Sequence, residues 1–153
     1  MTRNESQWTS MGLLILRLGI GGFLLSHGVG KLRMLMAGNF EQLGNPIGIG
    51  NVPSLVLVTF AEFLCALLVI LGLGTRFAAM PVVISMAVAA FVAHAKDPLS
   101  SETAAMAFFA GTSKTWFSKE PALMYLICFL ALAFTGAGKF SVDGWIARRR
   151  GGV

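Results

Sequence analysis

Charged residues are scarce in this sequence. Only 12% of its 153 residues are charged and 56% are hydrophobic, whereas a soluble domain usually carries about 25% charge. This composition excludes an ordinary soluble domain and indicates an integral membrane protein. At this length we expect a single domain over residues 1–153.

Cysteine and histidine are also scarce, with two of each. Cys65 and Cys128 form no C-x-x-C motif, and with the histidines and carboxylates they give no metal or haem spacing. The sequence therefore predicts no metal site, and the cysteines are interpreted as small buried hydrophobes. A redox-active pair remains an alternative if the second and fourth predicted helices touch at this depth.

The sequence has no folded basic module of the kind that nucleic-acid binding requires. The net charge is +5, and much of it comes from the tail Arg148–Arg150. This tail is predicted to lie against anionic lipid headgroups, so membrane lipids rather than nucleic acids are the expected partners.

Long apolar runs divide the chain into four predicted membrane-spanning helices. Each run is close to the ~20 residues that cross ~30 Å of hydrocarbon, and none alternates with the period of a barrel strand. The predicted fold is therefore all-α, an integral membrane four-helix bundle. The first run is too long for a signal peptide and lacks an A-x-A cleavage site, so we expect it to be retained. The predicted spans are residues 11–35, 53–73, 77–95 and 121–138.

The loop between the third and fourth predicted spans contains a short apolar stretch, Thr103–Ala110. It is too short to cross a bilayer, so we predict an interfacial or re-entrant segment there. Trp116 and Phe117, in the same loop, are typical of the aromatic belt at a membrane surface.

Basic residues predict how the chain is oriented. Four spans place both termini on one side, and that side carries Arg3, Arg76, Lys139, Arg148, Arg149 and Arg150. The opposite loops carry Arg33, Lys96, Lys114 and Lys119. Because basic residues favour the cytoplasmic side, this excess of six over four predicts cytoplasmic termini.

Ionisable residues inside the predicted spans are the main functional signal. Arg17, His27 and Lys31 lie in the first span, and Glu62 is the only charge in the second. A charge in hydrocarbon costs at least ~2.5–3.5 kcal/mol, so such residues usually face a bundle interior and have a partner. The sequence therefore predicts a polar site between the helices.

Helical spacing places these residues on one face of the first span. At ~100° per residue, Arg17, His27 and Lys31 fall within a stripe about 80° wide. Gly21 and Gly28 lie at the edge of this stripe, where small residues let another helix approach closely. We therefore assign Arg17, Gly21 and Gly28 supporting roles.

Depth predicts which residues meet. Glu62 lies roughly 13 Å below the outer end of its helix, at 1.5 Å per residue, which matches the depth of His27. Lys31 lies just above, and His94, near the outer end of the third span, can join from another side. The predicted ligand-binding residues are His27, Lys31, Glu62 and His94.

Two interpretations of this cluster remain open. It is either a buried structural network that sets helix register, or an outward-opening pocket. In the pocket, His27 and Lys31 hold an oxygen or an anion and Glu62 balances charge or moves a proton. Arg17 has its own alternative, because it lies near the cytoplasmic end and a long side chain can reach the interface.

Three motifs, in order, resemble the DoxX family of small membrane proteins. They are Arg17–Leu32 with His27-Gly28-x-x-Lys31, Glu62 followed by Gly72–Arg76 (GLGTR), and the ending Gly136–Asp143 (GAGKFSVD). The resemblance runs from about Leu13 to Trp145 and implies a four-helix bundle in a bacterial inner (cytoplasmic) membrane.

The resemblance also implies a loose link to redox work, although most members have no established activity. Relatives include the DoxD-type subunit of a thiosulfate:quinone oxidoreductase, and a DoxX-type protein is described as the membrane part of a complex with superoxide dismutase and a sulfurtransferase. A quinone would suit the predicted pocket, with apolar walls such as Phe23, Phe60, Phe63 and Phe91.

Three functions are therefore weighed. The first is a quinone-linked redox subunit of an oxidoreductase complex. The second is a non-enzymatic scaffold that recruits soluble redox or sulfur-handling proteins. A carrier is disfavoured, because four short-looped spans without discontinuous helices offer little for alternating access. The sequence leaves a homo-oligomer open.

Overall fold

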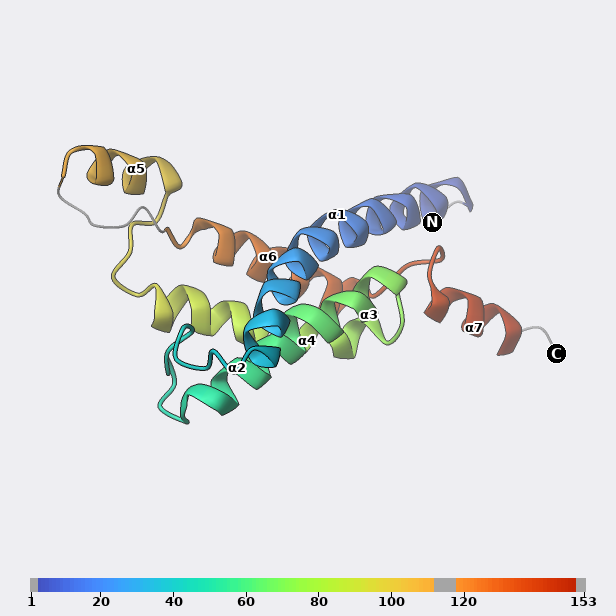
Figure 1. The fold of residues 1–153 in the computed structure, drawn as a ribbon. Coiled ribbons are helices and arrows are strands. Elements are labelled where there is room, and N and C mark those ends of the chain that lie inside the picture. The colour runs from blue at the N-terminus through green and yellow to red at the C-terminus, as the bar shows by residue number, and fades with distance from the viewer. Residues whose placement is uncertain (1–2, 112–117, 151–153) are drawn as a thin grey trace.

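The computed structural model describes residues 3–111 and 118–150 of the chain (Figure 1). The described residues are helical or in turns and contain no strand, so the predicted all-α class is confirmed. Three helical rods are long and apolar enough to cross a membrane: Gln7–Met36, Asn51–Leu71 and Thr75–Ala93. A fourth apolar helix, Glu120–Thr135, is shorter.

The first rod is α1, Arg3–Met36, and it is the longest helix. It extends further toward the N-terminus than the predicted span at residues 11–35. Helical hydrogen bonds are satisfied within the segment, so a helix continues beyond the apolar run that crosses hydrocarbon.

The second rod is built from three consecutive helical segments. α2, Asn51–Thr59, leads into a π-helical turn, η1, Phe60–Cys65, which leads into α3, Ala66–Leu71. The rod ends at Gly72, whose φ of 72° is left-handed and typical of a helix-ending glycine. The predicted span at residues 53–73 therefore lies two residues too late in the chain.

The third rod also ends in a π-helical turn. α4, Thr75–Val88, continues into η2, Ala89–Ala93, whereas the predicted span was residues 77–95. The last apolar helix, α6, Glu120–Thr135, is three residues shorter at its end than the predicted 121–138. It stops because Gly136 and Gly138 both take positive φ angles, of 78° and 76°.

The rods run up and down, with both termini at one end of the bundle (Figure 1). The Gly72–Gly74 turn and α7, Val142–Arg150, lie at the same end. The loops before α2 and after η2 lie at the other end. α5, Ser101–Phe109, stands beyond that end and away from the rods, where a short non-spanning segment was predicted. Trp116 and Phe117 fall outside the described residues.

Packing is unequal around the bundle. α1 packs along α2, η1 and α3, whereas α6 packs mainly on α4. The central core joins these pairs through apolar side chains, many of them small: Leu24, Cys65, Ala66, Val69, Ala78, Ala79, Val82, Met86, Phe129 and Leu132. Small residues at these positions let helices approach closely without a hydrophobic driving force in lipid. α1 and α6 touch each other much less than α1 touches the second rod or α6 touches α4.

Candidate functional site

An ion pair between α1 and η1 is the chemical centre of the candidate site. Lys31 Nζ lies 2.5 Å from Glu62 Oε2. The Glu62 side chain is 5% exposed and the Lys31 side chain 19% exposed. The carboxylate is thus enclosed, whereas the ammonium group keeps one side open, and it has further N–H donors beyond the one that Glu62 accepts.

Gly28 brings η1 close enough for this pair to form. A Cβ at Gly28 would overlap the carbonyl oxygen of Glu62, so only glycine fits the observed backbone approach. Gly21, two turns earlier, packs in the same way, and a Cβ there would overlap the Ile70 side chain. The glycine edge of the polar stripe is therefore where α1 meets the second rod.

Both π-helical turns flank the site. Glu62 lies within η1, and His94 is the residue at which η2 ends. A π-turn inserts an extra residue into a helix and is frequently found at functional sites, because it turns a side chain out of the regular helical register.

The two histidines lie at the edge of the site without joining the ion pair. The His27 ring meets Tyr125 edge to face, with ring centroids 6.3 Å apart and planes at 80°. Within the described part of the chain, no hydrogen bond links His27 to Lys31 or Glu62. His94 Nδ1 lies 2.6 Å from Asp97 Oδ2, so its nearest charged partner is in its own loop.

A cavity of about 450 Å³ brings all four predicted ligand-binding residues together. Its lining combines these residues with apolar and small polar ones: Leu24, His27, Lys31, Glu62, Met86, Ala89, His94, Ser101, Ser118, Pro121, Ala122 and Tyr125. This volume lies within the usual range of roughly 300–1,000 Å³ for small-molecule sites. We call it the polar cavity.

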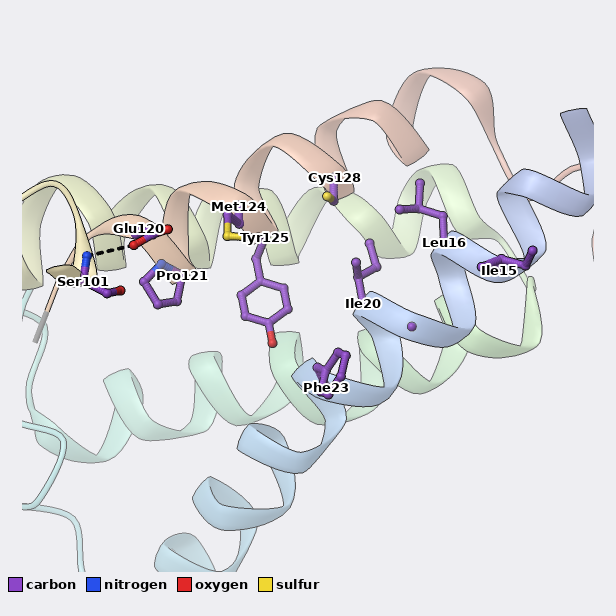
Figure 2. Close-up of a pocket in the computed structure, with 11 residues that line it drawn as sticks. Ile15, Leu16, Ile20, Phe23, Ser101, Glu120, Pro121, Met124, Tyr125 and Cys128 are labelled. Atoms are coloured by element: carbon purple, nitrogen blue, oxygen red, sulfur yellow. Dashed lines mark hydrogen bonds between the residues drawn. The ribbon is translucent and has the colours of Figure 1, made fainter.

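A second hollow, of about 540 Å³, lies next to the polar cavity, between α1 and α6 (Figure 2). We call it the α1–α6 groove. It shares Ser101, Pro121 and Tyr125 with the polar cavity, and its other lining is almost wholly apolar. The remaining lining residues are Ile15, Leu16, Gly19, Ile20, Phe23, Glu120, Met124 and Cys128.

The walls differ from those predicted. Phe23 lines the α1–α6 groove rather than the polar cavity, and Phe60, Phe63 and Phe91 line neither. Phe60 and Phe91 are exposed on the outer surface of their helices. The aromatic wall is instead Tyr125, which the sequence reasoning missed. As the only tyrosine of the chain and one inside an apolar helix, it was a detectable signal.

Arg17 lies away from the polar cavity and its side chain does not reach solvent. Its side chain is fully buried, and its guanidinium donates hydrogen bonds to the carbonyl oxygens of Val69, Ile70 and Phe140, at 3.3, 3.3 and 2.6 Å. The interpretation that it reaches the interface is therefore wrong. The reason is that the chain after α6 folds back over the end of the second rod and encloses the guanidinium.

The closing segment is held by a second polar contact. Asp143 accepts hydrogen bonds from the backbone N–H groups of Gly74 and Thr75, at 2.8 and 3.2 Å. It thus caps the start of α4 from a distant part of the chain, where no local side chain does so. Arg17 and Asp143 together fasten the end of the bundle at which the two termini lie.

Neither cysteine is paired. Cys65 is buried in the core within η1, and Cys128 is half-buried and lines the α1–α6 groove. The thiol of Cys65 is therefore inaccessible, whereas the thiol of Cys128 faces a hollow.

The fold and site together define a small multi-pass helical membrane protein with a buried ion pair beside a cavity. The DoxX family model matches residues 12–95, and the chain belongs to the DoxX family, as its motifs predicted. It is 30% identical over 145 residues to an uncharacterised membrane protein of Mycobacterium tuberculosis, covering 90% of this chain and 82% of that one.

A second relative is an uncharacterised protein of Haemophilus influenzae. It is 29% identical over 147 residues, which cover 92% of this chain and 94% of that protein. No solved structure gives a significant match. The matches therefore extend over nearly the whole chain and establish the family and the membrane class.

Proposed function

We propose that this DoxX-family protein is a quinone-binding membrane subunit of an oxidoreductase complex in a bacterial inner membrane. The observation that carries the proposal is the polar cavity built directly on the Lys31–Glu62 pair. A purely structural ion pair needs no such hollow, because the two charges satisfy each other. Here the partly exposed Lys31 keeps donors free beside the hollow.

Charge favours a neutral ligand over an anion. Lys31 and Glu62 cancel each other, so with neutral histidines the cavity carries no net charge. A doubly charged inorganic anion such as thiosulfate would gain little here and would lose its hydration. A ring with carbonyl oxygens needs only one or two donors and apolar walls, which Leu24, Met86 and Ala89 provide.

The residues then have distinct roles. Lys31 and His27 donate hydrogen bonds to the ligand's oxygens, and Glu62 holds the Lys31 ammonium group in place. His27 and His94 line the cavity and can donate ring N–H groups, so we assign them the supply of protons when a quinone is reduced to a quinol. The electrons come from a soluble redox protein bound to the same complex.

Thermal stability in detergent tests the proposal. A benzoquinone with a fully substituted ring should raise the melting temperature of the purified protein, and thiosulfate should not. His27→Ala should remove the quinone shift, while Phe91→Ala, on the outer surface, should keep it. Mass spectrometry of the extracted protein should also detect retained quinone.

The opposite result points to another function. Stabilisation by thiosulfate but not by quinones would overturn the proposal. If no quinone is retained and none stabilises the protein, the chain is better explained as a scaffold that recruits soluble redox or sulfur-handling proteins.

A further inference from the structure

The α1–α6 groove opens on the outside of the bundle at the level of the apolar run. Ile15, Phe23 and Met124, which line it, are 68%, 70% and 61% exposed. From Ile15 to Phe23 the α1 wall extends about 12 Å at 1.5 Å per residue. Since α1 is a membrane-spanning helix, lipid hydrocarbon surrounds this face.

The chemistry of the groove suits a hydrocarbon chain. Its polar groups lie at one end, where Ser101 donates its backbone N–H to Glu120 at 2.8 Å (Figure 2). Along the rest of the groove the walls are Ile15, Leu16, Ile20 and Met124 with the open surface of Gly19. Apart from the Tyr125 hydroxyl and the Cys128 thiol, no side chain of this lining can hydrogen-bond a polar headgroup or a peptide backbone.

Tyr125 stands between the groove and the polar cavity. Figure 2 shows its ring extending from α6 toward α1, with the hydroxyl group at the far end near Phe23. The same ring meets His27, which lines the polar cavity. The two hollows are therefore neighbours that share one aromatic wall, and a molecule that occupies both contacts this side chain.

We infer that the groove receives the hydrocarbon tail of the ligand whose ring occupies the polar cavity. This inference rests on the proposed function and narrows its substrate class to membrane-dissolved, long-tailed quinones. Such a ligand enters sideways from the bilayer between α1 and α6, the most loosely packed of the neighbouring rods. Tyr125 is then a positioning residue at the junction of ring and tail.

Two glycines of α1 provide a matched pair of variants. Gly19 lines the groove and a Cβ there meets no atom within 4 Å, so a side chain can start at this position and Gly19→Leu places bulk in the groove. Gly22 is exposed on the same helix, also has nothing within 4 Å, and lines neither hollow. Gly22→Leu is therefore the control.

The probes are two analogues with the same dimethoxy-methyl benzoquinone ring, one with a decyl tail and one with a methyl group in its place. Each is titrated against the full-length protein in one detergent, and each ligand is compared only between variants, because this removes its partition into micelles. Gly19→Leu should weaken binding of the decyl analogue at least fivefold and change binding of the methyl analogue less than twofold. Gly22→Leu should change neither.

Cys128 gives an independent measurement with the native sequence. It lines the groove, whereas Cys65 is buried in the core, so a maleimide should label Cys128 first. The decyl analogue should slow this labelling at least fivefold at saturation, and the methyl analogue should not. Full substitution of the ring prevents the quinone itself from adding to the thiol.

The outcomes separate the two proposals. If neither analogue binds the unmodified protein, the proposed function fails. If both bind but Gly19→Leu and Cys128 labelling do not distinguish them, the proposed function stands and the tail site is overturned. The tail site is also overturned if Gly19→Leu breaks an oligomer in detergent, since the groove would then hold a second copy of this chain.

Discussion

Glu62 is the most enclosed ionisable group of the polar cavity, and Lys31 is its only charged contact within the described part of the chain. Removing one member of a buried pair leaves the other desolvated and unbalanced, which usually costs about 3–5 kcal/mol. We therefore expect Glu62→Ala to lower the free energy of unfolding by that amount, about 3–5 kcal/mol, measured by denaturant titration in detergent.

The double variant Glu62→Ala/Lys31→Ala should cost less than the sum of the two single variants. The loss in the free energy of unfolding is smaller because removing both residues leaves no unpaired buried charge. Strict additivity of the single losses would show that the two residues do not act on each other.

A substitution at Gly28 tests the same site by changing the backbone approach of α1 and η1 rather than a charge. Because a Cβ there overlaps the Glu62 carbonyl oxygen, Gly28→Ala must push η1 away from α1. Overpacking of this kind costs about 1–3 kcal/mol, and we expect the quinone-induced melting shift to fall as well. Gly22→Ala, at a site with open space, is the matched control and should leave both measurements unchanged.

Among the elements, the closing segment depends most on long-range contacts. Asp143 caps α4 although nearly seventy residues separate them in the chain. Loss of a helix cap costs about 0.5–2 kcal/mol, so Asp143→Ala should lower the free energy of unfolding by about that much. Asp143→Asn keeps an acceptor oxygen and should lose less; equal losses in the two variants would argue against a capping role.

The sequence predicted where the helices lie better than where they end or where π-helical turns interrupt them. Apolar runs favour helices that can cross hydrocarbon, and the helices end within a few residues of most predicted span ends. Two π-helical turns were not predicted: η1, which contains Glu62, and η2, which ends the third rod. A single extra residue in a helix leaves no periodic signal in the sequence. The early end of α6 was missed because Gly136 was read as part of the apolar run rather than as a helix stop.

Some features of the candidate site were likewise predictable from the sequence and others were not. Helical spacing and depth predicted that Glu62 lies level with His27 and that Lys31 lies just above. The structure pairs Glu62 with Lys31 and places the His27 ring against Tyr125. The enclosure of Arg17 was unpredictable, because it depends on where Phe140 and its neighbours fold back. The α1–α6 groove was also invisible in the sequence, since it results from how unequally the rods pack.

For the whole molecule, the remaining expectation is its orientation. The excess of basic residues beside the termini predicts that both lie in the cytoplasm, and the structure places them at one end of the bundle (Figure 1). A reporter that is active only in the cytoplasm should therefore be active when fused after Val153. Activity of a reporter that works only in the periplasm would reverse the orientation and turn the polar cavity toward the cytoplasm.

The shortness of α6 has a consequence for the surrounding bilayer. Its 16 residues extend about 24 Å, less than the ~30 Å of hydrocarbon, whereas α1 is longer than that thickness. Such hydrophobic mismatch thins the lipid beside α6, at a cost of fractions of a kcal/mol per ångström. The thinned lipid borders the α1–α6 groove, so headgroups and water come nearer to Tyr125 and the histidines. Quinone binding should therefore strengthen in bilayers of shorter acyl chains, and the membrane itself becomes a determinant of how readily the cavity fills.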